Sequence, residues 1–344
     1  MSRIHFEVTH PAHVHLFRHA IRELAADHSV VVTSREKDLT TDLLDAYDIE
    51  HTVLSSKGMR KIDLITEWIA RDLRTLRYDY RYDPDVIVSR LNPTAVHAAV
   101  MTGAKSVVFH DHEGSNGLAE LLAPFTDRFC TPATFEGDFG DSHRRYDGFQ
   151  ELAYLHPDRF TPDRSTLREH GVDPDEPYFV LRFVSMGAHH DVGLEGLSAA
   201  TKRRLVEELS EHGEVYVSSE GPIPDELSAQ ELPVPPEAML DLLYDASLMV
   251  TDSNTMATEA GLLGTPVVRS GAYASDEFSN FSTLAEAGLV DSVPEATETV
   301  DRALELAADP DANARWEQRR DAFLEDKIDV TEYIIETVLE VADE

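Results

Sequence analysis

The chain has 344 residues, enough for two domains of ordinary size, and its 42% hydrophobic content is typical of a globular protein. Its 65 acidic and 30 basic residues give a formal net charge of -35, which argues against nonspecific binding to nucleic acid or anionic membranes, since both need clustered Lys and Arg. No apolar run approaches the ~20 residues of a transmembrane segment, and the first residues alternate like a strand and not like a signal peptide. The single cysteine, Cys130, excludes an internal disulfide. We therefore expect a soluble cytoplasmic protein.

Short apolar runs alternate with helical patterns along the first half of the chain, which is typical of βαβ units that build a parallel sheet. The expected strands cover residues 4–8, 30–33, 51–54, 86–89, 106–109 and 128–131. The expected helices lie between them, at residues 14–27, 37–47, 62–78, 94–102 and 117–122. A segment rich in Pro and charge, 156–163, has the composition of a linker, so we place the first domain at residues 1–160.

The same alternation starts again after this linker. The expected strands cover residues 178–183, 214–218, 247–250 and 267–268. The expected helices cover residues 198–212, 239–246, 300–308, 312–323 and 330–341. We therefore predict an α/β protein with two Rossmann-like domains and parallel sheets, the second domain at residues 161–325 and a C-terminal segment at 326–344.

The segment from Thr251 to Val268 has the pattern of a strand end, a helix start and a second strand. All four residues at 252–255 are good helix N-caps, and none has a Glu or Gln three positions later to close a capping box. We therefore expect the N–H groups at this helix start to bind an anionic ligand. Glu259 can face a groove and suits a ribose diol, and Gly264 ends the helix. The alternative is an ordinary capped helix of an α/β domain.

Three further loops follow predicted strands and carry ionisable side chains, and ligands of open α/β sheets gather at such strand ends. The first loop places His13 at a helix start, and the second carries Glu113 between His and Gly residues. The third carries Arg182, whose charged fork suits a diphosphate, and His189. For each loop the alternative is structural: the histidines cap a helix or lie on the surface, and the acidic loop is simply solvated.

A metal site is a separate hypothesis for the N-terminal histidines. His10, His13 and His15 could ligate a metal ion, with Asp111 or His112 joining from the second loop. Their spacing is not that of an HExxH helix, and no cysteine cluster accompanies them. We therefore expect no metal ion and no other cofactor.

Over nearly its whole length the chain resembles the DUF354 family of GT-B-like proteins, which are related to UDP-N-acetylglucosamine 2-epimerases and GT-B glycosyltransferases. The resemblance rests on residues 10–15, 111–113, 182–190 and 252–259. It implies two Rossmann-like domains with an interdomain cleft, and a last helix that packs back on the N-terminal domain.

The same resemblance implies roles for single residues. The implied diphosphate ligands are Arg182, Ser253, Asn254 and Thr255, and the implied ribose ligand is Glu259. The implied catalytic groups are Glu113, His13 and His189.

Three functions are compatible with these residues. The first is glycosyl transfer from a nucleotide sugar, expected to be a UDP-sugar, to a glycan or lipid-linked acceptor in surface-glycan or glycolipid assembly, with Glu113 or His13 as the base. The second is epimerisation of a UDP-N-acetylhexosamine at C2, with Glu113 as acid or base. Against it, Asn92 stands near the place of an Asp of that family, and an amide cannot exchange protons. The third is noncatalytic binding of a nucleotide sugar. We also expect that two copies of the chain can form a homodimer.

The acidic residues are spread along the chain and do not form a tail, and only 6 of the 30 basic residues are lysine. This composition resembles that of halophilic archaeal proteins, whose charged surfaces remain soluble because concentrated salt screens the repulsion between them. The net negative charge therefore indicates a saline habitat and does not identify a ligand.

From this charge we predict that the fold loosens in dilute salt. The midpoint of thermal unfolding should fall markedly between ~3 M and ~0.1 M KCl, because the screening length grows from a few ångströms to about 10 Å over that range. Circular dichroism melts at a series of KCl concentrations measure it. A midpoint that does not move with salt would contradict the halophilic interpretation.

Overall fold

The computed structural model describes residues 1–56, 61–183, 197–219, 231–270 and 279–344. Within that part of the chain, no helix combines the length and the hydrophobicity that a membrane crossing requires. The chain divides into two compact units. Unit 1 comprises Met1–Arg159 and Ile328–Glu344, and unit 2 comprises Phe160–Lys327.

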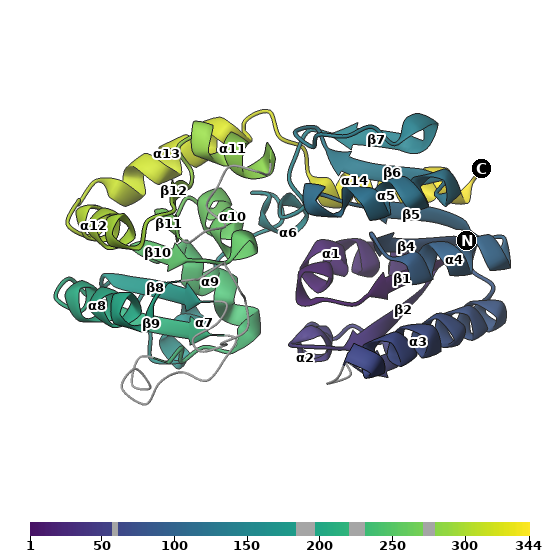
Figure 1. The fold of residues 1–344 in the computed structure, drawn as a ribbon, viewed down its shortest axis with the longest axis horizontal. Helices are drawn as coiled ribbons and strands as arrows, with labels where there is room; N and C mark the ends of the chain where they lie inside the picture. Colours follow the sequence, from purple (N-terminus) through teal and green to yellow (C-terminus); the bar gives the residue numbers. More distant parts are fainter. Residues whose placement is uncertain (57–60, 184–196, 220–230, 271–278) are drawn as a thin grey trace. The chain divides into compact units, whose positions relative to one another are not determined.

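Unit 1 contains a sheet of seven parallel strands in the order β3-β2-β1-β4-β5-β6-β7 (Figure 1). Its strands are β1 (Arg3–Val8), β2 (Ser29–Glu36), β3 (Thr52–Ser56), β4 (Val86–Arg90), β5 (Lys105–Phe109), β6 (Arg128–Pro132) and β7 (His143–Tyr146). Its helices are α1 (Pro11–Asp27), α2 (Thr40–Ala46), α3 (Lys61–Tyr82), α4 (Pro93–Thr102), α5 (Asn116–Leu122), α6 (Leu152–Leu155) and α14 (Val330–Ala342), with short 3-10 turns at Glu113–Ser115, Ala123–Phe125 and Gly140–Ser142. The direction of strand order reverses between β1 and β4, so this is the switch point of the sheet.

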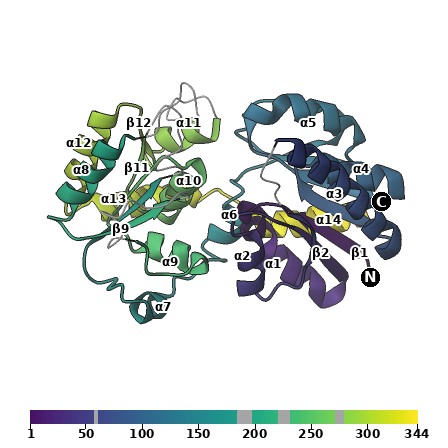
Figure 2. The ribbon, with the colours of Figure 1, turned by 60° about the horizontal axis from the view of Figure 1, so that its bottom comes forward.

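The two faces of β1 differ in chemistry. Ile4, Phe6 and Val8 are fully buried, and the ring of Phe6 lies 5.4 Å from that of Phe17 on α1. His5 and Glu7 alternate with them and therefore face the other side of the sheet, toward α3. Figure 2 shows α3, α4 and α5 together on one side of this sheet and α1 on the other. The C-terminal helix α14 contacts α1, α6, β4 and β5, so the end of the chain completes unit 1.

Unit 2 contains a sheet of five parallel strands in the order β12-β11-β10-β8-β9. Its strands are β8 (Tyr178–Phe183), β9 (Glu214–Ser219), β10 (Leu248–Thr251), β11 (Val267–Ser270) and β12 (Asp291–Val293). Its helices are α7 (Arg164–Glu169), α8 (Ala199–Leu209), α9 (Met239–Tyr244), α10 (Asn254–Leu263), α11 (Ser279–Glu286), α12 (Ala296–Ala307) and α13 (Ala312–Leu324), with a 3-10 turn at Pro236–Ala238. The switch point here lies between β8 and β10.

Apolar side chains of β8, β9, β10 and β11 form the core of unit 2 together with α8, α12 and Trp316 of α13. The indole N–H of Trp316 donates to the carbonyl oxygen of Leu289 at 2.9 Å, which satisfies its polar atom inside this core. The sheet is therefore held by one continuous apolar layer on this side.

The predicted α/β class with two parallel sheets is confirmed. The sequence pattern missed two strands, β7 and β12, because both are short edge strands without an apolar alternation. Helix α1 begins at Pro11, three residues earlier than predicted, because His10 supplies its N-cap. Gly264 ends α10 as predicted, with the left-handed φ of 82° that favours glycine.

Candidate functional site

In unit 2 the parallel register aligns four polar side chains at the carboxyl ends of adjacent strands. Arg182 on β8 pairs in register with Ser218 on β9 and with Thr251 on β10, and Thr251 pairs with Arg269 on β11. Register partners in a parallel sheet point to the same face, so these side chains form one row across the switch point. We call Ser218, Arg182, Thr251 and Arg269 the edge row.

The N-terminus of α10 begins directly after this row. Ser253 is the N-cap, and its hydroxyl accepts from the N–H of Met256 at 3.5 Å. The residue three positions after the cap is Met256, so no capping box closes this end, as predicted. Among the described residues no acceptor binds the N–H groups of Asn254 or Thr255. These N–H groups have the geometry of an anion site at a helix N-terminus.

Each arginine of the edge row donates a hydrogen bond to a polar side chain beside it. Arg182 Nη1 donates to Ser218 Oγ at 2.5 Å. Arg269 is 1% exposed, its Nη1 donates to Asn254 Oδ1 at 3.3 Å, and its guanidinium stacks 4.0 Å from the ring centre of Phe281. Both guanidinium groups therefore lie at the carboxyl edge of the sheet, one hydrogen-bonded to a hydroxyl and the other to an amide.

A lysine lies on the opposite face of β8. Lys202, in the first turn of α8, is 4% exposed, and its ammonium lies 4.8 Å from the ring centre of Phe183. Burial lowers the pKa of Lys202, while the neighbouring carboxylate of Asp252 acts to raise it. The N–H of Asp252 in turn donates to the carbonyl oxygen of Arg182 at 3.4 Å. The end of β8 therefore has a cation on each face.

The structure corrects the expected exposure of Glu259. This side chain is 6% exposed, and its neighbours Ala257, Thr258 and Ala260 are buried as well. Helix α10 is covered by β10, β11, α9, α11 and α13, so a carboxylate in its middle cannot lie on an open surface. A ribose-binding role for Glu259 stays a prediction, and a substitution there changes a buried group. The predicted diphosphate ligands Ser253, Asn254 and Thr255 do lie at the start of this helix.

His189, predicted as a catalytic group, lies outside the described residues.

In unit 1 the predicted His13 lies at the switch point between β1 and β4. His10 is the N-cap of α1, and its Nδ1 accepts from the N–H of Ala12 at 3.2 Å. His13 Nδ1 accepts from the N–H of Thr9 at 3.4 Å. Burial, together with Arg90 and His10, holds the pKa of His13 well below its usual range. A neutral ring that accepts at Nδ1 carries its proton on Nε2, so Nε2 of His13 is a hydrogen-bond donor in this arrangement, and the role of His13 as a base stays a prediction.

Arg90, the last residue of β4, forms an ion pair with Asp111, which follows β5. The same guanidinium lowers the pKa of both His13 and His110, so it lies near both loops. His110 itself is 2% exposed, packs against Phe135 with ring centres 5.3 Å apart, and has its pKa lowered to about 3, mainly by burial. His110 is thus a core residue, whereas Arg90 joins the two predicted loops.

Glu113 begins a 3-10 turn after β5 and is partly exposed. Its Oε1 accepts from the backbone N–H of Glu136 at 3.4 Å. This contact fixes the carboxylate in the loop that follows β5, at the same edge of the sheet as His13 and Arg90. Of the two carboxylates in this loop, Asp111 is paired with Arg90, and Glu113 belongs to a partly exposed residue whose Oε2 is buried.

The amide of Asn92 is held by two structural contacts. Its Oδ1 caps α4 by accepting from the N–H of Thr94 at 3.1 Å, and its Nδ2 donates to Glu7 Oε2 at 2.7 Å. Glu7 is 2% exposed, and burial raises its pKa to about 7, against the opposing charges of Arg71 and His5. The side chain of Glu7 is therefore a buried carboxyl group close to the edge of the sheet where the strands of unit 1 end.

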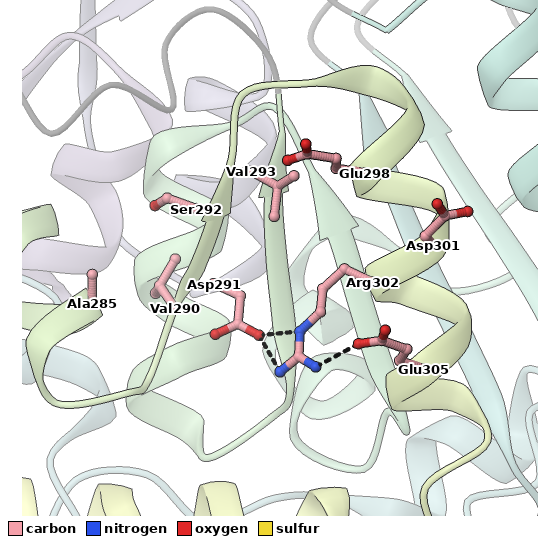
Figure 3. A pocket seen from close by; sticks show the side chains of 9 residues that line it. All are labelled: Ala285, Val290, Asp291, Ser292, Val293, Glu298, Asp301, Arg302 and Glu305. Carbon is pink, nitrogen blue, oxygen red and sulfur yellow. Dashed lines mark hydrogen bonds and ion pairs between the residues drawn. The ribbon is translucent and has the colours of Figure 1, made fainter.

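A separate hollow of about 590 Å³ lies between β12 and α12. Figure 3 shows Glu298, Asp301 and Glu305 around Arg302, whose guanidinium donates to Asp291 at 2.7 Å and to Glu305 at 3.0 Å. The carboxylates outnumber the one arginine, so this hollow would repel a diphosphate. Elsewhere in the described chain, no group of three or more His, Cys, Asp or Glu side chains is arranged to hold a metal ion.

Three of these cations were not predicted from the sequence. The apolar patterns end the strands at Ser89 and Val268, one position before Arg90 and Arg269 respectively. A basic residue directly after a buried parallel strand is the signal that could have found both. Lys202 had a weaker signal, since it is one of only six lysines and lies in the first turn of a predicted helix.

Two parallel α/β units of this kind define a GT-B-type fold, which several solved structures share. A UDP-GlcNAc 2-epimerase from Neisseria meningitidis bound to UDP-GlcNAc is 13% identical, with 98% of this chain and 100% of that chain covered and a TM-score of 0.67. The spinosyn forosaminyltransferase SpnP is 16% identical, with 100% of both chains covered and a TM-score of 0.65. The glycotransferase of kitacinnamycin is 18% identical, with 99% of both chains covered and a TM-score of 0.61. At these identities the similarity is one of fold.

The chain belongs to the family described as Protein of unknown function (DUF354), whose model matches residues 2–343. The predicted family is therefore confirmed. No curated protein matches the chain.

The raised pKa of Glu7 predicts a pH dependence of stability. Because the folded state keeps this proton up to about pH 7 and the unfolded state loses it near pH ~4.3, the stabilisation is complete below ~4.3 and is lost as pH rises through about 7. Glu7→Gln stays neutral and keeps an acceptor for Asn92. Relative to wild type, its unfolding free energy should therefore rise between pH ~4 and ~8 by up to about 3 kcal/mol.

Urea unfolding at constant KCl across that pH range measures the difference. The exposed Glu50→Gln is the matched control, and its stability should run parallel to that of wild type. If the unfolding free energies of wild type and Glu7→Gln changed with pH in parallel, the pKa of Glu7 would be the same in the folded and unfolded states.

Proposed function

We propose that this protein transfers a glycosyl group from a nucleotide diphosphate sugar, with a UDP-sugar as donor, to a hydroxyl of a glycan or lipid-linked acceptor. The observation that carries the proposal is the edge row of unit 2, where Arg182 and Arg269 flank Thr251 just before the N-terminus of α10. The fold shared with nucleotide-sugar enzymes, one of them bound to UDP-GlcNAc, supports the choice of donor.

The diphosphate is the leaving group of this reaction. As the bond between the sugar C1 and the phosphate oxygen breaks, its electron pair and negative charge stay on the diphosphate. Arg182 and the N–H groups of Asn254 and Thr255 would stabilise that charge, because such fixed donors need no rearrangement at the moment of reaction. Arg269 would hold the turn by its bond to Asn254.

The acceptor hydroxyl needs a base. We assign this role to Glu113, a partly exposed residue whose carboxylate would take the hydroxyl proton as the acceptor oxygen forms its bond to C1. His13 would act differently from the first expectation. Its Nε2–H would donate a hydrogen bond to a sugar or acceptor oxygen, since its Nδ1 accepts from Thr9 and its pKa is low.

Epimerisation at C2 is less well supported by the contacts in unit 1. It needs a group that removes a proton and a group that returns one. Asn92 cannot do either, and both ends of its amide already bind Thr94 and Glu7. We therefore prefer transfer.

Nucleotide binding tests the edge row. We expect UDP to bind wild type in molar KCl, and Arg182→Gln to weaken binding roughly tenfold or more, because each charge-assisted bond to phosphate is worth about 1.4 kcal/mol or more. Arg269→Gln should also weaken UDP binding, and Arg269→Lys should weaken it less. Both comparisons require melting midpoints close to that of wild type. Arg302→Gln, in the acidic hollow of the same unit, is the matched control and should bind UDP normally. Isothermal calorimetry gives the affinities, and equal affinity in all four variants would exclude the edge row as the site.

Solvent deuterium separates transfer from epimerisation. Incubation with UDP-GlcNAc in deuterated buffer without an acceptor should leave C2 free of deuterium, because transfer breaks no C–H bond. NMR spectroscopy of the recovered sugar nucleotide measures this. Deuterium at C2 would contradict transfer and support epimerisation. Failure of every nucleotide diphosphate to bind would exclude both reactions.

A further inference from the structure

Helix α3 buries a polar stripe against the sheet and exposes an apolar stripe on its outer side. Arg71, Thr75 and Asp79, at a spacing of four residues, are 9%, 0% and 0% exposed. Asp79 Oδ1 lies 2.8 Å from Nδ1 of the buried His5 on β1. An amphipathic helix on a sheet normally has the opposite polarity, with its apolar stripe buried.

The apolar stripe of α3 lies on the other side. Ile69, Leu73 and Tyr80 are 53%, 61% and 59% exposed, and Trp68 next to them is 48% exposed. Since the inner stripe holds Asp79 against His5, rotation of α3 to bury these side chains would separate this pair. The outer apolar stripe is therefore a fixed property of this fold.

The neighbouring helices extend this surface. On α4, Val100 and Met101 are 53% and 48% exposed, and the carbonyl of Met101 accepts from Tyr80 Oη at 3.0 Å. On α5 and the 3-10 turn after it, Leu121 and Phe125 are 64% and 57% exposed. A groove of about 450 Å³, lined by side chains of α3, α4 and this segment, joins the three. We call the outer surface of residues 68–82, 93–102 and 116–125 the apolar face (Figure 2).

The apolar face differs from the rest of the chain in charge. Its three segments contain four arginines and three carboxylates, whereas the whole chain has 65 acidic and 30 basic residues. Two copies of a chain with a net charge of -35 repel each other over most of their surfaces. The near-neutral apolar face is where two copies approach with the least repulsion.

Its composition and size fit association with a protein. Aromatic residues, Met and Arg are enriched at protein interfaces while Lys is depleted, and the three segments contain no lysine. At roughly 100 Å² for each half-exposed large side chain, its eight most exposed ones offer about 800 Å², the area that one partner of a standard interface buries.

We propose that the apolar face is the interface of a two-fold symmetric homodimer. In such a dimer the same surface of each copy covers the other, and the groove of one copy receives apolar side chains from its partner. The Asp72 carboxylate lines this groove and pairs with His97 Nδ1 at 2.9 Å. A protein partner can leave that pair hydrogen-bonded, whereas lipid hydrocarbon cannot solvate it, so a second copy fits the groove better than a membrane does.

Sedimentation equilibrium of the full chain in molar KCl tests this. We expect a mass twice the 38.4 kDa of one chain at micromolar concentration. Leu73→Glu and Phe125→Glu should each sediment as monomers with unchanged circular dichroism, because both positions are exposed and no core contact is lost. Leu39→Glu is the matched control, since Leu39 is 42% exposed in unit 1 but lies outside the apolar face, and it should remain dimeric.

Other results would overturn the proposal. Monomeric wild type, or a dimer that survives both Glu substitutions, would exclude this interface. A monomer that sediments with phosphatidylcholine vesicles, and loses that binding in Leu73→Glu, would assign the face to a lipid surface. None of these measurements involves a nucleotide, so the outcome is independent of the proposed function.

Discussion

Parallel strand pairing is the constraint on which both candidate sites depend. When every strand of a sheet runs the same way, all carboxyl ends lie on one edge, and residues far apart in sequence meet there. In unit 2 this brings Arg182, Thr251 and Arg269 into one row from three strands. Side chains alternate between faces, so a shift of one residue in β8 would exchange Arg182 for Phe183, a member of the apolar core. The register that buries Phe183 is thus the same register that presents Arg182.

The strong negative charge makes the placement of each arginine informative. At the surface, many arginines pair with carboxylates, as Arg315 does with Asp309 and Arg302 with Asp291. At the carboxyl edge of unit 2, Arg182 donates to Ser218 and Arg269 donates to Asn254. Each of these contacts fixes the direction of a guanidinium at the edge where the strands end. In unit 1, Arg90 at the carboxyl edge is paired with Asp111.

Local signals in the sequence were sufficient for the fold class and for the ends of α10. Both depend on short-range chemistry: apolar runs in the strands, a Ser253 cap and a Gly264 stop. Burial and hydrogen-bond partners depend on residues distant in sequence, so local signals do not predict them. Glu259 is covered by helices that lie before and after it in the chain, and the proton position of His13 follows from a contact with the backbone of Thr9. Arg90 and Arg269 become important only through strand register, which the sequence pattern does not specify.

Helix α3 connects the apolar face to the candidate site of unit 1. Its inner stripe places Asp79 against His5 and Arg71 near Glu7, and Glu7 holds the amide of Asn92. Asn92 caps α4, which lies in the apolar face and follows directly on the switch-point strand β4. These polar contacts are buried and specific, so α3 and α4 cannot slide on the sheet without breaking a charged or capping contact. The inverted polarity of α3 therefore has two consequences. It holds α3 and α4 in place on the sheet whose carboxyl edge carries His13 and Arg90. It also exposes an apolar surface that association with a second copy would cover.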